Sequence, residues 1–429
     1  MRNKPIAITL ITLMGLVIAA CNNGGNTSTT TQASIPQLNQ NAINFIFVQS
    51  FESNSTFNNL SIQGFNHSLL FGQLLNQITA SQIAGIYALN PASDIVNNYP
   101  NMAAIQSIEN YAVLNGRGIN DTLPNNPHAI ASFISNILSN SSTGSTNGNY
   151  ILALPAATIN ATLNGLSSVP NLYFNYQPLI NSNQYAILSI ANMANVTMNT
   201  YTDGITPSNN YPQLKLTTGA QCLESSVVIH STGTPPANIN TNETVYFVRH
   251  VEAHPTNNFD NGNYVCQGQW RAIGANSILL EIMGGMPDYV YSSSPADEYD
   301  SSTFPYTYVR PSLTINPFTI QYNQPLNLIE STQFAWGNYE SLVQYFFTGN
   351  EFNNKTVLVA WEHATIDNAV QYLFTNTYNQ TLPANLPTWS YTDYDTVWKL
   401  QTDGQGNLTF SNTCEGIADQ TLPLSCPLF

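Results

Sequence analysis

The stretch TVYFVRHVE, residues 244–252, decides the fold of the C-terminal half of this chain. Its first five residues are all β-branched or aromatic, which is typical of a buried strand. Arg249 and His250 follow at once, at the point where such a strand would end. Catalytic groups of open α/β sheets collect at the carboxyl ends of the strands. The stretch therefore predicts a central strand with a functional arginine–histidine pair at its end.

Short apolar runs of the same kind occur on both sides of this stretch. They are residues 43–48, 83–87, 289–291 and 356–361, and helical patterns such as residues 269–283 and 339–347 lie between them. Strands that alternate with helices predict a mostly parallel sheet covered by helices on both faces. We therefore expect an α/β protein of two tandem three-layer α/β/α domains. Two further polar pairs, Ser292-Ser293 and Glu362-His363, should then share an edge of the sheet with His250.

The two halves of the chain align with each other in four blocks that keep one order. Residues 47–53 match 247–253, 86–92 match 290–296, 105–107 match 309–311, and 150–159 match 357–366. This order predicts a duplicated domain. The residues opposite Arg249, His250, Arg310, Glu362 and His363 are Gln49, Ser50, Gln106, Pro155 and Ala156. Because every ionic or basic position is lost in the first copy, we expect residues 40–215 to form a degenerate, non-catalytic domain and residues 216–429 to form the functional one.

The N-terminus has the features of a bacterial lipoprotein signal. A basic start is followed by an apolar run too short to span a membrane, which predicts a signal peptide over residues 1–20. Small residues precede Cys21, so we expect cleavage before this cysteine and membrane anchoring through lipid chains attached to it. Residues 21–39 have little to bury and should form a disordered tether. Asn22, in place of an aspartate, favours the outer membrane, facing the periplasm or the cell surface, over the inner membrane.

The charge balance argues against a nucleic-acid partner. The chain has 9 lysine and arginine residues against 24 aspartate and glutamate residues, a formal net charge of −15 at pH 7. Nucleic-acid binding needs the opposite sign of charge. The arginines that follow the signal peptide are Arg117, Arg249, Arg271 and Arg310. Since basic residues are so scarce, Arg249 and Arg310 are better explained by a phosphate pocket than by solvation.

The cysteines predict covalent crosslinks. Cys222, Cys266, Cys414 and Cys426 follow the lipidated cysteine. An even number in an exported chain predicts two disulfides, in any of three pairings. These cysteines lack the spacing of a metal site and the histidines do not cluster, so we expect neither a metal nor another cofactor.

The polar motifs of the second half together resemble the histidine phosphatase superfamily, which has the phosphoglycerate mutase-like fold. The motifs that carry the resemblance are residues 248–252, 268–272 and 290–295, Arg310, and residues 358–363. It covers roughly residues 243–372 directly. The resemblance implies that His250 is the nucleophile and becomes phosphohistidine, and that Arg249, Arg310 and His363 bind the phosphate. Arg271 is expected to belong to the helix after Gly268 and not to the pocket.

The residue types fit this chemistry. Arginine presents a planar fork to phosphate oxygens, and neutral imidazole is nucleophilic near pH 7. Val251 departs from the family, which has glycine or alanine there, so some repacking is expected. Ala253 stands where the acid-phosphatase branch has a further arginine, which argues against that branch. His254 follows and is expected to face solvent.

The general acid is left open by the sequence. The branch that places an aspartate directly after the second histidine does not apply, because Ala364 stands there. Glu362 is slightly favoured, because a carboxylate at the end of an apolar strand needs a reason to be there. The alternative for Glu362 is a structural role, as a partner that orients Arg249 or Arg310. Glu330 lies nearer to where the mutase branch carries its acid.

These observations favour a cell-envelope phosphatase that hydrolyses phosphorylated small molecules through a phosphohistidine intermediate on His250. One alternative is a lipoprotein that keeps the fold for ligand or partner binding, but such a module has no need to retain Arg249, His250, Arg310 and His363 together. A phosphate-ligand receptor without turnover is the third possibility. It would keep the arginines but would tolerate loss of His250.

Overall fold

The computed structural model describes residues 35–80, 82–141, 148–168, 172–192, 194–253, 261–299 and 306–429. All of them belong to one compact unit, Ile35–Phe429. The predicted signal peptide, Cys21 and most of the predicted tether lie outside the described residues, as does His254. Among the described residues, no helix has the length and apolar character required to cross a bilayer.

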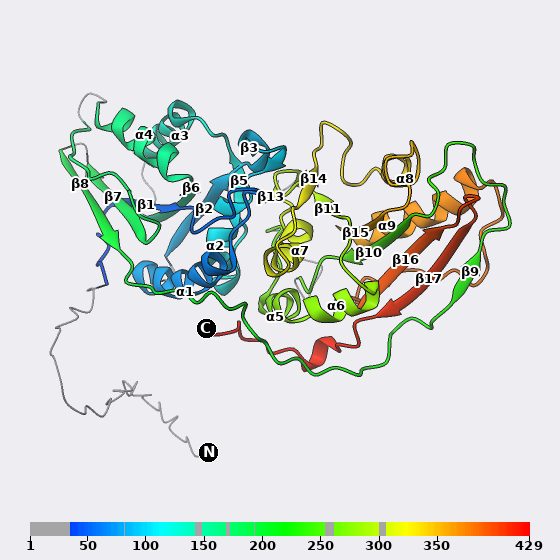
Figure 1. The fold of residues 1–429 in the computed structure, drawn as a ribbon. Coiled ribbons are helices and arrows are strands. Elements are labelled where there is room, and N and C mark those ends of the chain that lie inside the picture. Colours follow the sequence, from blue (N-terminus) through cyan, green and yellow to red (C-terminus); the bar gives the residue numbers. More distant parts are fainter. Residues whose placement is uncertain are drawn as a thin grey trace, which may run out of the picture. The chain divides into compact units, whose positions relative to one another are not determined.

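The first half of the unit is built on a six-stranded sheet with the strand order β5-β2-β6-β1-β7-β8 (Figure 1). Neighbouring strands are parallel from β5 to β1 and antiparallel from β1 to β8. The strands are β1 (Ile43–Gln49), β2 (Ile83–Leu89), β5 (Asn120–Leu123), β6 (Gly148–Leu154), β7 (Gln184–Asn192) and β8 (Asn195–Thr202). The helices are α1 (Ile62–Thr79), α2 (Ala103–Leu114), α3 (Pro127–Ser141) and α4 (Ala156–Ser167).

Alternating residues of β1 pack into two different cores, which makes this half three-layered. Ile46 and Val48 share a core with residues of α1 and α2. Phe45 and Phe47 share another core with residues of α3 and α4. This is the period-two alternation of a strand that is covered on both faces.

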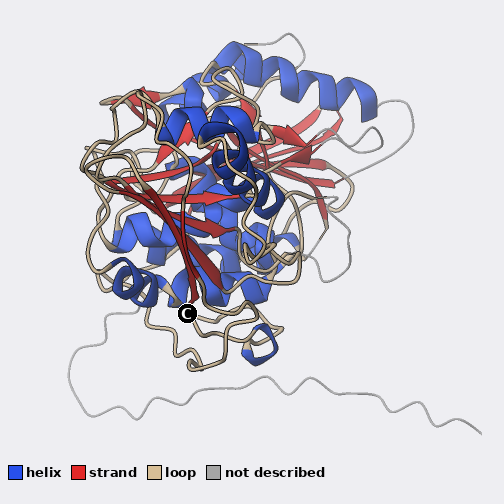
Figure 2. Cartoon of the chain, turned by 90° about the vertical axis from the view of Figure 1, so that its right-hand side faces the viewer, coloured by secondary structure: helices blue, strands red, loops and turns tan. Residues whose placement is uncertain are grey.

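The second half is built on a seven-stranded sheet with the order β14-β11-β15-β10-β16-β17-β9. Its strands are β9 (Val228–His230), β10 (Thr244–Arg249), β11 (Tyr289–Ser293), β14 (Asn327–Ile329), β15 (Thr356–Trp361), β16 (Thr396–Thr402) and β17 (Leu408–Cys414). Helices α5 (Cys266–Gly274), α6 (Asn276–Met283) and α7 (Arg310–Gln321) cover one face. Helices α8 (Tyr339–Phe347) and α9 (His363–Tyr372) cover the other. Figure 2 shows helices on both sides of the strands, and the predicted α/β fold class is confirmed.

One helix departs from the expected elements. The helix predicted over residues 269–283 is divided into α5 and α6, and the break falls at Ala275, directly after Gly274. Glycine is a poor helix former, and Gly274 lies against the side chain of Leu216. The remaining short elements are β3 (Ile95–Val96), β4 (Tyr99–Pro100), β12 (Glu298–Tyr299), β13 (Tyr306–Thr307), η1 (Pro91–Ser93), η2 (Leu373–Thr377) and η3 (Asp419–Thr421).

The two sheets share strand order, strand direction and register. Phe47 pairs with Leu152 and Phe247 pairs with Val359, which are residues opposite each other in the sequence alignment of the halves. Six of the seven strands of the second sheet have a counterpart in the first, and β9 is the additional one.

The third aligned block, 105–107 against 309–311, is wrong by three residues. The amide of Val251 donates to Thr314 Oγ1, and this hydroxyl donates to the carbonyl of Arg310. The same chain of bonds in the first half runs from Phe51 to Ser107 and then to the carbonyl of Ala103. The position of Arg310 is therefore matched by Ala103 and not by Gln106.

Two disulfides form, as predicted, and the structure selects one of the three pairings. Cys222 pairs with Cys414, and Cys266 pairs with Cys426. The first joins the segment between the sheets to the end of β17, and the second joins the start of α5 to the C-terminal tail. Both crosslinks therefore stabilise the second half.

Candidate active site

The predicted site residues lie at the carboxyl edge of the second sheet. Arg249 is the last residue of β10 and pairs with Trp361, the last residue of the parallel strand β15. The amide of His250 donates to the carbonyl of Trp361 (3.1 Å). His363 is the first residue of α9, two residues beyond β15. The strand arrangement thus brings the two histidine-bearing segments side by side.

His250 is a neutral imidazole held in one orientation. It is 1% exposed, and its Nδ1 lies 2.8 Å from the carbonyl oxygen of Val251. A carbonyl can only accept, so Nδ1 carries the proton and Nε2 keeps its lone pair. Burial, and then the charges of Arg249 and Arg310, lower the pKa of His250 well below its ordinary value. The imidazole is therefore unprotonated at neutral pH.

Arg249 is fixed by the backbone of the loop before β16. Its Nη1 lies 2.8 to 3.4 Å from three carbonyl oxygens of that loop, and its Nη2 lies 3.4 Å from Nε2 of His250. The guanidinium also lies 4.1 Å from the ring centre of Tyr394. The three carbonyls are those of Ser390, Tyr391 and Asp393. One edge of the guanidinium is thus anchored while the other faces the histidine.

Arg310 begins helix α7 and is fully buried. Its Nε donates to the carbonyl of Gly262 (3.3 Å), and its guanidinium lies 5.0 Å from the ring centre of Tyr308. Arg310 and His363 both contribute to the lowered pKa of His250. The structure therefore brings His250, Arg249, Arg310 and His363 together.

Glu362 has the surroundings of a structural carboxylate. It is the N-cap of α9 and accepts from the amides of Ala364 (2.9 Å) and Thr365 (2.7 Å), while its Oε1 lies 2.7 Å from Nδ1 of His363. Burial favours its neutral form, but the contacts with His363 and the two amides outweigh burial and lower its pKa to about 2. A carboxylate that stays ionised at neutral pH cannot supply a proton to a leaving group.

Glu330 has the opposite environment. It follows β14, and burial raises its pKa although a hydrogen bond from Ser294 partly opposes the shift. Two more carboxyls act on this region. Burial first, and then the charge of Glu330, raise the pKa of Asp297 to about 6, and burial raises the pKa of Asp121 on β5 to about 8. Burial thus favours the protonated form of Glu330, whereas its contacts hold Glu362 in the ionised form.

The sequence did not point to Asp297 or to the tyrosines around the histidine. Asp297 comes close to Glu330 only because of the turn after β11, where its Oδ1 accepts from the amide of Ser331 (3.2 Å). The rings of Tyr308 and Tyr394 lie 6.2 and 5.9 Å from that of His250. The position of Asp297 a few residues beyond a predicted strand end was the single signal in the sequence.

Val251 is accommodated by a glycine. It is buried, and a Cβ on Gly268 would lie 2.8 Å from its Cγ2 and 2.5 Å from the carbonyl oxygen of Glu252. The branched side chain therefore occupies space that Gly268 leaves open, which is the repacking expected from the sequence.

Arg271 lies on the helix after the Gly268 turn, α5, as predicted. It is buried, and its guanidinium lies 2.7 to 2.9 Å from four carboxylates. These are Glu252, Asp395, Glu415 and Asp419. This cluster joins the loop after β10 to the C-terminal tail.

The first half has a buried cation in the equivalent place. His67 on α1 is fully buried between Glu52 and Asp203, with a distance of 3.0 Å to each. Glu52 and Glu252 are matched in the sequence alignment. Asp203 directly follows β8 and Glu415 directly follows β17, and these two strands are counterparts in the shared strand order. Burial opposes protonation of His67, but the hydrogen bonds to Asp203 and Glu52 raise its pKa to about 9.

The carboxyl edge of the first sheet lacks the ionic groups. Gln49 stands in place of Arg249, and its Nε2 donates to the carbonyls of Asn181 and Gln184, just as Arg249 donates to the loop before β16. Ser50, Ala103 and Ala156 replace the two histidines and Arg310. Gln49 therefore keeps the kind of hydrogen bonds to the backbone that Arg249 makes, but it carries no positive charge.

No group of three or more metal-ligating side chains is arranged to hold an ion within the described ranges.

Comparison with known proteins returned no matching family model and no matching curated protein. Among solved structures, phosphoglycerate mutase from Plasmodium falciparum aligns at 17% identity over 44% of this chain and 99% of its own, with a TM-score of 0.27. The protein histidine phosphatase SixA, complexed with tungstate, aligns at 14% identity over 40% of this chain and 97% of its own, also with a TM-score of 0.27. The likeness concerns the fold and covers less than half of this chain.

Proposed function

We propose that this protein is a phosphomonoesterase that works through a phosphohistidine on His250 and needs no metal. The observation that carries the proposal is the unprotonated Nε2 of a buried histidine that lies among Arg249, Arg310 and His363. Arginine forks bind the equatorial oxygens of a transferring phosphoryl group and stabilise its charge. Phosphorylated small molecules are therefore the proposed substrates.

In the first step, Nε2 of His250 attacks phosphorus and the bond from phosphorus to the ester oxygen breaks. The proton for the leaving oxygen is assigned to Glu330, because burial raises the pKa of this carboxyl. The carbonyl of Val251 accepts from Nδ1–H and stabilises the ring as it becomes positively charged. Arg249 and Arg310 hold the phosphoryl oxygens.

In the second step, water attacks the phosphorus of the phosphohistidine and the bond to Nε2 breaks. Glu330, now a carboxylate, takes a proton from this water, so inorganic phosphate leaves and both groups return to their starting states. Glu362 is assigned a positioning role, since it caps α9 and lies against His363.

We also propose the setting and the division of labour predicted from the sequence. The chain is anchored by lipid at Cys21 in the cell envelope, with residues 40–215 as a non-catalytic copy of the catalytic region, residues 216–429. The shared strand order and register of the two sheets support the duplication, and the absence of charge at Gln49 and Ser50 supports the loss of catalysis in the first copy.

The test is hydrolysis of phenyl phosphate by the full chain in detergent, with a chelator present, compared with His250→Ala. The matched control is His230→Ala, an exposed histidine on β9. We expect chelator-resistant phosphate release, a loss of about 10³-fold or more in His250→Ala, and no change in the control. Acid-labile phosphate on the wild-type chain would identify the intermediate. Phosphate binding without turnover would instead favour the receptor, and neither binding nor turnover would favour the binding module.

A further inference from the structure

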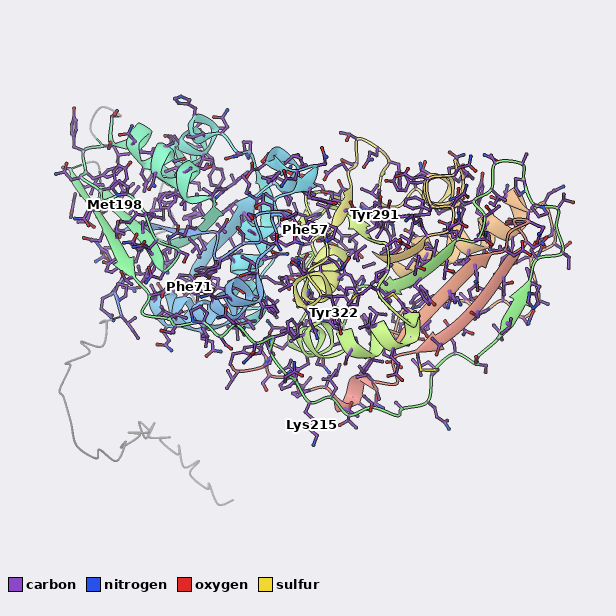
Figure 3. All side chains as sticks on the ribbon, in the orientation of Figure 1. Phe57, Phe71, Met198, Lys215, Tyr291 and Tyr322 are labelled. Carbon is purple, nitrogen blue, oxygen red and sulfur yellow. A yellow bond between two sulfur atoms is a disulfide. The ribbon has the colours of Figure 1, made fainter. Side chains whose placement is uncertain are left out.

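A cavity of about 360 Å³ lies where the start of α1 meets the end of α7. Its polar lining comes from both halves of the chain and consists of amides and hydroxyls. Asn59, Ser61 and Gln63 contribute from one side, and Gln321, Asn323 and Gln324 from the other. The ring of Phe57 lies at the same cavity, held edge to face by Tyr99 at 5.4 Å between ring centres. Figure 3 labels Phe57 and Tyr322, the residue that follows α7.

This cavity is distinct from the candidate active site. Arg310 stands at the N-terminus of α7, and the cavity is lined by Gln321 at the other end of the same helix. Eleven residues of α-helix span about 16 Å. A ligand in the cavity would therefore not contact the phosphoryl group.

The lining selects against charged ligands. None of the residues that line the cavity is a lysine, arginine, histidine, aspartate or glutamate. A charged ligand would lose its water without gaining a partner of opposite charge. Side-chain amides both donate and accept, which suits hydroxyl groups, since each of these also donates and accepts.

One buried acceptor in the lining lacks a donor. Asn59 is 3% exposed, and its Nδ2 donates to the carbonyl of Gln324 (3.2 Å). Its Oδ1 is buried and accepts no hydrogen bond from the residues that the structure describes. Because this oxygen has almost no accessible surface, a ligand in the cavity does not reach it, and Asn59 serves to join the two sides of the lining through its bond to Gln324.

We propose that the cavity binds a neutral carbohydrate of one or two sugar units. The amides of Gln63 and Gln321 exchange hydrogen bonds with its hydroxyls, and Phe57 packs against the C–H face of a ring. The volume is at the lower end of the range of small-molecule sites, which limits the ligand to this size. Since residues of both halves line the cavity, the sugar would also bridge them.

The test is isothermal titration calorimetry of the full chain with D-glucose, N-acetyl-D-glucosamine and maltose. The variants are Gln63→Leu and Phe57→Ala, and the matched control is Gln344→Leu, an exposed glutamine on α8. Leucine is a good helix former, so Gln63→Leu should fold, and its circular dichroism would verify this. We expect saturable binding of at least one sugar with a Kd of about 1 mM or tighter. Both variants should weaken sugar binding at least tenfold, which is about the effect of losing one good contact. The control should leave the Kd unchanged.

Three results would overturn the proposal. One is the absence of saturable binding for all three sugars. Another is unchanged affinity in folded Gln63→Leu and Phe57→Ala. The third is binding that inorganic phosphate abolishes, which would place the sugar beside His250. Because the assay measures binding and not turnover, its outcome is independent of whether the chain hydrolyses phosphate esters.

Discussion

The Nδ1 atom of His250 donates to the carbonyl oxygen of Val251 across 2.8 Å, and this bond leaves the lone pair on Nε2. The pKa of His250 lies well below its ordinary value because of burial and the charges of Arg249 and Arg310. Lowering the pH from 7 to 6 should therefore leave His250, the proposed nucleophile, neutral. On the alkaline side, the proposed mechanism requires the protonated form of Glu330, whose pKa is raised by burial.

We predict that kcat/KM for phenyl phosphate is flat through mildly acidic pH and declines as the pH rises past the pKa of Glu330. Asp297 and Asp121 are the other titratable groups that act on this region, and both lose protons in the same alkaline direction. Phosphate release measured from pH 5 to 9 tests this. A one-proton decline between pH 7 and 6 that persists after correction for the substrate's own ionisation near pH 6 would contradict the assigned state of His250.

The roles of Glu330 and Glu362 separate in a pair of isosteric variants. We expect Glu330→Gln to lower kcat about 10²- to 10⁴-fold for an alkyl phosphate, whose leaving group needs a proton, and much less for 4-nitrophenyl phosphate. Glu362→Gln should reduce the free energy of unfolding by about 1 kcal/mol through the weakened cap of α9. It should keep the same ratio of activities on the two substrates as the wild type. The reverse pattern would return the acid role to Glu362.

Removal of the buried cation on α5 should destabilise the second half. Arg271→Met leaves four carboxylates close together without their shared partner. Loss of one member of a buried ion pair typically lowers the free energy of unfolding by about 3 to 5 kcal/mol. Urea denaturation would measure the change, with Arg117→Met at an exposed position as the control. A change as small as that of the control would mean that the carboxylates are neutral without the arginine.

The same cluster makes stability depend on pH. Burial raises the pKa of Glu415 to about 7, and burial together with Glu252 raises the pKa of Asp419 to about 7. Because the folded state favours the protonated carboxyls, this contribution is complete below pH 4 and is lost as the pH rises through 7. We therefore expect a higher midpoint of urea denaturation at pH 5 than at pH 8. Glu415→Gln should reduce the difference between the two midpoints.

Gly268 should resist substitution more than its helical location implies. A Cβ there would lie 2.5 Å from the carbonyl oxygen of Glu252 and 2.8 Å from Val251. Gly268→Ala should destabilise the fold by about 1 to 3 kcal/mol and shift the loop that carries His250. Gly165 on α4 has open space around it, so Gly165→Ala should stabilise the helix by roughly 1 kcal/mol. Thermal unfolding of the two variants should therefore move in opposite directions, and a stable, fully active Gly268→Ala would contradict the packing argument.

The strands and the main site residues could be predicted because they depend on local patterns. Short β-rich runs identified β10 and β15, and parallel strands place their carboxyl ends at one edge, so Arg249, His250 and His363 had to lie together. Asp297 could not be found in this way. Its proximity to Glu330 depends on the path of a turn, and nothing in the composition of residues 294–299 indicates that path.

The misaligned third block has a different cause. Helices α2 and α7 are apolar and buried over most of their length, so a shift of three residues keeps similar residue types on the same face. Only the hydrogen bonds of Ser107 and Thr314 fix the correspondence. The partners of Arg271 were equally hidden, because Glu252 and Asp419 are far apart along the chain and meet only in the folded state.

The two halves should respond differently to alkali, because His67 in the first half occupies the place that Arg271 has in the second. A guanidinium keeps its charge at every pH in which proteins are studied, whereas the imidazolium of His67 loses its proton as the pH passes about 9. The stabilisation that comes from the raised pKa of His67 is complete below the ordinary pKa of histidine, and it is lost as the pH rises through about 9. In strongly basic solution Glu52 and Asp203 then face each other across a neutral ring, while the cation of α5 stays in place. In base the second half should therefore loosen first, at the carboxyls around Arg271, and α1 should follow when His67 loses its proton.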